Sequence, residues 1–186
     1  TSLDYVDVDS LTLNGGTIKD AGGNNVALTL PSPGETGSLS NNKTIVIDTE
    51  QPTINNVTSS TANGTYGING TISIQVVFSD PVTVTGIPRL TLETGGTDAV
   101  VDYSSGSTSN TLTFTYTVQE GDAYTSLDYV DVDSLTLQTG GTIKDAGGNN
   151  VALTLPSPGE LGSISYNTTF VIDGEKPTVT NVTSST

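Results

Sequence analysis

The chain has 186 residues, of which 20 are acidic and 5 are basic, and it contains no Cys, His, Met or Trp. This composition excludes disulfides, thiol nucleophiles, Ser-His and Cys-His catalytic pairs, zinc sites and haem ligation. With a formal net charge of -15 it offers no electrostatic footprint for nucleic acid, and no apolar run approaches the length of a membrane span. The oxygen ligands of Asp, Glu and Asn remain, and they suit a hard cation such as calcium.

The sequence repeats itself. Residues 1–61 recur as residues 125–186 with one residue added near Thr139, and 51 of the 61 aligned positions are identical. The copies start 124 residues apart, so the chain corresponds to about one and a half periods of a tandem array. We expect it to be an excerpt of such an array.

The joints between repeats are expected at IDTEQPT (47–53) and IDGEKPT (172–178), where a Pro follows a short acidic stretch. Pro has no N–H to give to a sheet ladder and therefore belongs at a strand entry or in a linker. Residues 1–48 are then the C-terminal part of a preceding repeat, which lacks most of its sheet and is not expected to be stable alone. Residues 49–173 form a complete repeat, and residues 174–186 form a linker and the first strand of the following repeat.

Apolar and polar residues alternate, as in half-buried strands, in several runs of the complete repeat. These runs are TISIQVVF (71–78), PRLTLET (88–94), TLTFTYTV (111–118) and NVALTL (150–155). Turn signals separate them at NGTYGING (63–70), SDPV (79–82), TGGT (94–97), SSGSTSN (104–110) and DAGGNN (145–150). We predict an all-β fold of antiparallel immunoglobulin-like β-sandwich repeats in tandem.

Several motifs are similar to those of bacterial Ig-like repeats. They are FSDPVTVTGIPRLTLETGG, SNTLTFTYTVQEGD, LDY, GGTIKDAGGN and VIDGEKPTV, and the similarity extends over essentially the whole chain. Such repeats have a cadherin-like architecture and build giant secreted adhesins and other cell-surface proteins. The resemblance implies an extracellular or cell-surface location. One departure is that the family often has an acidic residue where Thr125 or Ser126 stands, before Leu127.

Strand direction alternates in a sandwich, and this sorts the acidic loops between its two ends. Asp80 is expected near the N-terminal joint, and the QEGD loop (119–122) is expected beside the acidic residues of the C-terminal joint. Two like charges about 4 Å apart repel by roughly 4 kcal/mol at an effective dielectric near 20, so a bridging cation is expected. This resembles the calcium-stiffened junctions of cadherin-like arrays. The predicted Ca²⁺ ligands are Asp48, Glu50, Asp80, Glu120, Asp122, Asp128, Asp173 and Glu175. The alternative is that these are solvated loop residues.

Two further motifs carry oxygen ligands. In DYVDVDS (128–134), strand alternation places Asp131 and Asp133 on one face, and a solvated sheet edge is favoured over a calcium site because no EF-hand Gly or distal Glu follows. In DAGGNN, a tight hairpin turn is favoured over a ligand set.

The sequence therefore predicts a structural extender repeat of a long extracellular filament or surface adhesin, rigidified by calcium at its junctions and without enzymatic activity. One alternative is a self-assembling surface-layer, sheath or filament protein with lateral contacts. Another is a carbohydrate-binding module that uses Tyr66, Tyr103, Tyr124 and Tyr129, although these side chains fit core edges and loop anchors better. The expected partners are neighbouring repeats of the same chain, like chains in a filament, and host or cell-surface glycans through other domains.

Overall fold

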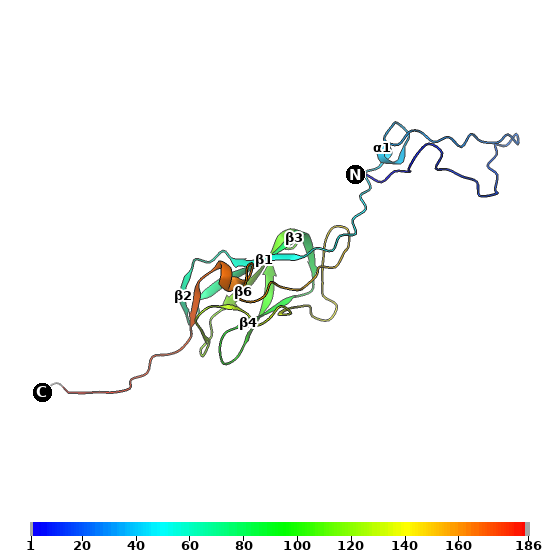
Figure 1. Cartoon of the computed structure of the whole chain (residues 1–186). Coiled ribbons are helices and arrows are strands. Elements are labelled where there is room, and N and C mark those ends of the chain that lie inside the picture. The colour runs from blue at the N-terminus through cyan, green and yellow to red at the C-terminus, as the bar shows by residue number, and fades with distance from the viewer. Residues whose placement is uncertain (1, 185–186) are drawn as a thin grey trace. The chain divides into compact units, whose positions relative to one another are not determined.

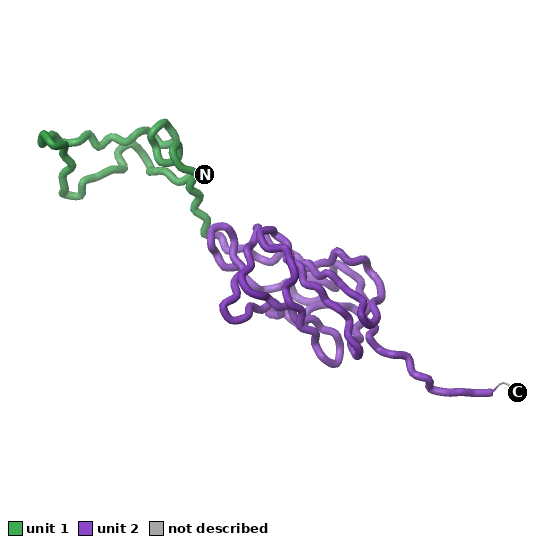
Figure 2. Tube along the Cα trace, turned by 180° about the vertical axis from the view of Figure 1, so that it is seen from behind, with its two compact units in different colours: residues 1–49 green, residues 50–186 purple. Residues whose placement is uncertain are grey.

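A computed structural model describes residues 2–184 of the chain. The chain divides into two compact units, residues 1–49 (unit 1) and residues 50–186 (unit 2), which Figure 2 shows in different colours. The division lies at Thr49, one residue beyond the predicted fragment 1–48.

The strands found among residues 2–184 lie in unit 2, which consists of a front half and a back half followed by the C-terminal residues. The front half, residues 50–124, carries β1 (Ile54–Ser59), β2 (Gly64–Gly67), β3 (Thr71–Thr85), β4 (Arg89–Glu93), β5 (Ala99–Ser105), β6 (Ser109–Thr117) and β7 (Ala123–Tyr124). The back half, residues 125–173, carries β8 (Asp128–Tyr129), β9 (Leu135–Thr136), β10 (Thr142–Lys144), α2 (Ile164–Asn167) and β11 (Phe170–Asp173). The long strands are thus in the front half.

The strands of unit 2 form two sheets. The larger sheet has the order β1-β3-β6-β5-β4-β8, with β10 paired to β3 and β9 paired to β4, and the smaller sheet has the order β2-β11-β7. The named strand pairs within residues 2–184 are antiparallel except for β11 with β2, which run parallel. The predicted all-β class is confirmed, and the helices of the described residues, α1 and α2, span four residues each.

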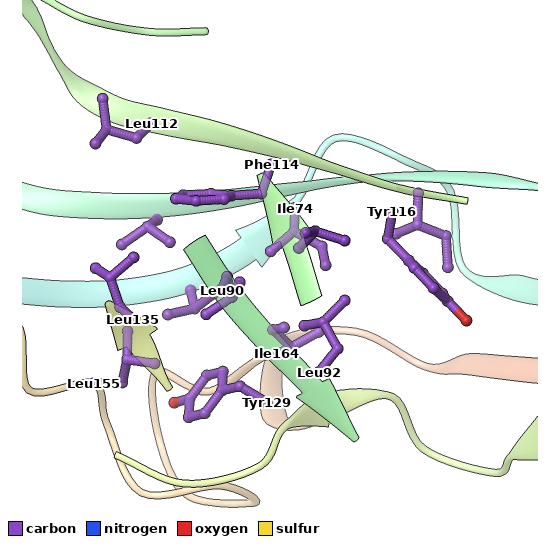
Figure 3. Packing of buried hydrophobic residues seen from close by; sticks show 14 of the residues in the cluster. Ile74, Leu90, Leu92, Leu112, Phe114, Tyr116, Tyr129, Leu135, Leu155 and Ile164 are labelled. Atoms are coloured by element: carbon purple, nitrogen blue, oxygen red, sulfur yellow. The ribbon is translucent and has the colours of Figure 1, made fainter. Parts of the chain in front are cut away.

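The core follows the predicted alternation. Ile72, Ile74, Val76 and Phe78 of β3 are buried, as are Leu112, Phe114, Tyr116 and Val118 on β6 and the following residue. Figure 3 shows Leu90 and Leu92 of β4 in the same cluster as Leu135, Leu155 and Ile164 of the back half. Full burial of such side chains stabilises a fold by about 1.5–3 kcal/mol each. Both halves therefore contribute to one core.

Three predicted local structures are wrong. SDPV (79–82) is not a turn, because β3 continues through it from its pairing with β6 to its pairing with β10, with a break in register between Val77 and Val82. Pro81 lies in that break, where no ladder N–H is required. GTYG (64–67) is a strand rather than a loop, because β11 supplies its partner. NVALTL (150–155) forms no strand, and only Asn150 bridges to Lys144.

Unit 1 contains α1 (Leu39–Asn42) and an isolated bridge between Lys19 and Asn25, and its described residues form no strand. Main-chain hydrogen bonds nevertheless close its loops, such as the bond from Leu3 N to Ile45 O at 2.7 Å. Many of its apolar side chains are exposed to solvent.

Residues 174–184 form no strand, although residues 174–186 were predicted to hold a linker and the first strand of a following repeat. Val179 and Val182 are exposed there, whereas their sequence counterparts Ile54 and Val57 in β1 are buried. The physical reason is that β1 obtains its ladder from β3, whereas residues 174–184 have no strand partner among the described residues. Ser185 and Thr186 lie outside the described residues.

Candidate functional site

The acidic loop 119–122 lies against the point where the chain leaves β11. Gly174 N donates to Asp122 O at 2.6 Å, Gly121 N donates to Gly174 O at 3.1 Å, and Asp173 pairs with Ala123 of β7. Glycine at position 174 allows this approach, because a Cβ there would lie 2.2 Å from the carbonyl oxygen of Gln119. The segments that carry Glu120, Asp122 and Asp173 are therefore adjacent at the C-terminal end of unit 2.

The Asp122 side chain fixes the conformation of this loop. Its Oδ2 accepts hydrogen bonds from the Tyr116 hydroxyl at 2.7 Å and from Gln119 N at 2.8 Å. Burial, followed by the hydrogen bond to Asp122, raises the pKa of Tyr116 above its ordinary value. This carboxylate thus joins the loop to the end of β6, in addition to any role in binding.

A lysine offsets part of the acidic charge at the same end. Lys176 Nζ lies 2.5 Å from Glu120 Oε2, with both side chains more than half exposed, so the pair stabilises the fold by at most about 1 kcal/mol. Gln51 occupies the corresponding position at the first joint, which therefore has no such cation. The charge of Lys176 was not included in the repulsion predicted between the acids of this joint. Glu175 is exposed beside it.

Asp80 lies beside the point where the chain enters unit 2. Ser79 Oγ donates to Asp80 Oδ2 at 2.7 Å, and Thr53 N donates to Ser79 Oγ at 3.1 Å. The alternating direction of successive strands had predicted Asp80 at this end. Of the other acids predicted for the first joint, Asp48 belongs to unit 1 and Glu50 to unit 2, and both are exposed.

Asp128 is buried, with 5% of its surface exposed, and holds the back half together. Its Oδ2 accepts from Gly159 N at 3.0 Å, from Ser165 Oγ at 2.6 Å and from Ser165 N at 3.3 Å. Its Oδ1 accepts from Tyr129 N at 3.0 Å and from Ile164 N at 3.3 Å. These donors satisfy both oxygens and fix the start of α2. Asp128 thus has a structural role that the sequence analysis missed, and its metal role stays a prediction.

The same arrangement recurs in unit 1 around Asp4. Asp4 Oδ2 accepts from Ser40 Oγ at 2.5 Å and from Gly34 N at 3.0 Å. The hydrogen bond from Ser40, helped by that from Gly34 and opposed by partial desolvation, lowers the pKa of Asp4 to about 2. The recurrence indicates that the sequence itself encodes this local structure.

The two remaining acidic motifs are turns. Asp131 and Asp133 are both exposed, and Asp131 Oδ1 accepts from Asp133 N at 2.9 Å, which makes a local turn rather than the predicted strand alternation. In DAGGNN, Asp145 Oδ2 accepts from Asn149 Nδ2 at 2.9 Å and Gly148 has φ +89°, so the favoured turn is present. Hydrogen bonds from Asn149, the side-chain bond foremost, lower the pKa of Asp145.

The tyrosines considered for carbohydrate binding are mainly anchors. Tyr66 packs edge-on against Phe170, Tyr103 packs edge-on against Phe114, and the Tyr129 hydroxyl donates to Pro156 O at 2.5 Å. Tyr124 is exposed and lines a shallow cavity of about 320 Å³ together with Glu93 and Asp128. A single exposed ring offers little surface for stacking a sugar.

Among residues 2–184, no three acidic side chains lie close enough together to hold a metal ion. The predicted calcium site needs ligands from two consecutive complete repeats, so it stays a prediction. No helix in the described part of the chain is long and apolar enough to cross a membrane. Comparison with known protein families, curated proteins and solved structures gives no match.

Proposed function

We propose that the chain is part of a structural extender, a non-catalytic tandem array of Ig-like sandwich repeats in a long extracellular filament or surface adhesin. The supporting observation is that the chain enters and leaves unit 2 at opposite ends (Figure 1). Ile54 of β1 lies opposite Phe78, whereas Asp173 of β11 lies opposite Gly67, just before β3 begins at Thr71. Thr71 and Phe78, which mark these two positions on β3, are about 23 Å apart at about 3.3 Å per residue.

Head-to-tail joining through such ends lets each repeat add its own length to the array. The identity of 51 of 61 aligned positions between the two copies favours a property that scales with copy number, rather than a private binding site in one repeat. The net charge of -15 would keep neighbouring arrays soluble and apart.

Arrays with two, four and six complete repeats test this function by small-angle X-ray scattering. We expect the maximum dimension to increase by a constant increment for each added repeat. Arrays that stay compact, or that associate side by side into ordered sheets, would contradict an extender and favour a surface layer.

We further propose that calcium binds where consecutive repeats meet and holds them in line. The support is that the segments of Glu120, Asp122 and Asp173 are adjacent at the chain exit, while Asp80 lies beside the chain entry. An Asp80 equivalent from the next repeat would then face the exit. Ca²⁺ accepts six to eight oxygens from carboxylates and main-chain carbonyls in flexible geometry, which suits ligands supplied by two domains.

Thermal unfolding of an array of two complete repeats, in EDTA and in millimolar calcium, tests this site. At tenfold excess over the dissociation constant, calcium should stabilise the array by about 1.4 kcal/mol per site. Asp173→Asn should abolish the calcium-dependent shift, and Asp133→Asn, an exposed residue outside both joints, should leave it intact. Identical midpoints with and without calcium would refute the metal site and leave the length measurement to decide on the extender.

A further inference from the structure

Unit 1 and the back half of unit 2 share many of their internal hydrogen bonds. The paired bonds are Leu30 N to Val8 O at 2.8 Å with Leu155 N to Val132 O at 2.9 Å, and Val26 N to Ile18 O at 3.0 Å with Val151 N to Ile143 O at 3.0 Å. The bonds to Asp4 and Asp128 are also alike, as are those from Tyr5 to Pro31 and from Tyr129 to Pro156. Unit 1 therefore adopts the local conformation of a back half, although many of its apolar side chains are exposed.

The two copies differ sharply in burial. Leu11 is 40% exposed and its counterpart Leu135 is 2% exposed, and Ile18 is 45% exposed whereas Ile143 is 1% exposed. The same holds for Ile47 at 65% against Ile172 at 2%. We call the side chains of Leu3, Leu11, Ile18, Val26, Leu39 and Ile47 the open face of unit 1. Conformation is shared between the copies, so the difference arises from what covers them.

In unit 2, the front half covers these positions. Leu135 pairs with Leu90 of β4, Ile143 pairs with Val84 of β3, and Ile172 pairs with Tyr66 of β2 and Tyr124 of β7. Figure 3 shows Leu135 and Leu155 in the same cluster as Leu90, and Ile164 in the same cluster as Leu92. Main-chain bonds accompany the apolar contacts, such as Val57 N to Gly162 O at 2.7 Å and Ala152 N to Pro52 O at 2.9 Å.

The acceptors and donors of those bonds are present in unit 1 as well. Gly37 and Ala27 stand where unit 2 has Gly162 and Ala152, and Asn42 stands where Asn167 donates to Val57 O at 2.8 Å. One position of unit 2 has a different residue in unit 1. Thr49 stands where Gly174 allows close approach of the 119–122 loop, so the joint itself must differ locally.

We infer that the open face of unit 1 is the docking surface for a second front half, a segment of the type of residues 50–124 that directly precedes Thr1. The front half of this chain does not fill that role, because its own core side chains, such as Leu90 and Leu112, are fully covered in unit 2. The connection is available in the sequence, since Tyr124 is followed by TSLDY, the same residues with which unit 1 begins. This inference does not depend on calcium or on the extender function.

Hydrogen exchange, measured by mass spectrometry in EDTA, tests the inference on two proteins. One is the chain of 186 residues, and the other is the same chain with a copy of residues 50–124 joined before Thr1. Peptides from the two copies can be told apart where their sequences differ, for example at Ile45 and Phe170. We expect amides of residues 2–49 to exchange at least 100-fold more slowly in the extended chain, and to approach the rates of residues 126–173.

Two variants of the extended chain provide a matched pair. Ile18→Asp places a charge on the open face and should remove the added protection from residues 2–49 while leaving unit 2 unchanged. Val6→Asp lies off the face, since Val6 is 90% exposed and its counterpart Val130 is still 39% exposed in unit 2, and should keep the protection.

Other outcomes would overturn the inference. If residues 2–49 gain no protection in the extended chain, or if both variants behave alike, a front half is not what covers this face. If the face is already protected in the 186-residue chain and protection rises with protein concentration, the occupant is a second copy of the chain. Protection that is independent of concentration would mean that unit 1 is stable by itself. The length and calcium experiments above do not depend on any of these results.

Discussion

Replacing Asp128 with alanine should destabilise unit 2 even when no metal is present. Two hydrogen bonds to its carboxylate come from distant residues, namely from Ser165 Oγ at 2.6 Å and from Gly159 N at 3.0 Å. A hydrogen bond to a charged group contributes about 1.5 kcal/mol or more, so these two together contribute about 3 kcal/mol. Buried N–H groups that lose their acceptor raise the cost further, and we expect a loss of about 3–5 kcal/mol in the free energy of unfolding.

Urea unfolding in EDTA, followed by far-UV circular dichroism, measures this loss. With a slope near 2 kcal/mol per molar urea, the midpoint should fall by roughly 1.5–2.5 M. Asp4→Ala removes the equivalent carboxylate from unit 1 and should leave the midpoint of unit 2 unchanged, which makes it the matched control. A midpoint for Asp128→Ala within about 0.3 M of the unsubstituted chain would refute the structural role, since it would correspond to an ordinary surface substitution. Destabilisation seen only in calcium would instead favour a metal ligand.

Three further outcomes are expected. Leu135→Ala should lower the free energy of unfolding by about 2–5 kcal/mol and Leu11→Ala by less than about 0.5 kcal/mol, and equal shifts in the urea midpoint would contradict the burial argument. The pKa of Asp145 is lowered in the folded state, chiefly by the side-chain hydrogen bond from Asn149. The ionised carboxylate therefore stabilises the fold fully above the ordinary pKa of about 3.9, and this stabilisation is lost as the pH falls towards the lower folded value. Asp145→Asn should therefore flatten the acid limb of a stability–pH curve, and an unchanged limb would argue against it. Gly106 has φ +109°, and a Cβ there would lie 2.1 Å from a main-chain oxygen of β6. Gly106→Ala should therefore lower the free energy of unfolding, measured by calorimetry, by more than about 2 kcal/mol. A smaller loss would mean that the turn can relax.

The front half of unit 2 could be predicted from the sequence because its strands carry their signal locally. β3 and β6 are long enough for alternation to be visible, and each inward residue from Ile72 to Phe78 and from Leu112 to Tyr116 is buried on its own strand. The back half could not be predicted in this way. β8 and β9 have two residues each and are strands only because β4 lies beside them.

The candidate site shows the same division. Alternating strand direction was enough to assign Asp80 to the chain entry and Asp122 to the chain exit. The partners of Asp128 lie 31 and 37 residues further along the chain, so only the folded structure shows that its carboxylate is already satisfied. Lys176 was visible in the sequence, and charge counting at the joint could have included it.

The short joint between the two units also affects the order of events while the chain is being synthesised. Residues 50–124 leave the ribosome when residues 1–49 are already present and residues 125–173 are not, so the nascent sheet first encounters a nearly identical but wrong partner. Mispairing of adjacent domains is a characteristic failure of repeat proteins. Wrong pairing would require the seven residues from Asp48 to Ile54, which are joined by six Cα–Cα steps, to cross about 23 Å, and six steps at full extension reach about 20–22 Å. In the wrong pairing this joint would have to be fully stretched, which favours pairing of the nascent sheet with the segment still to come.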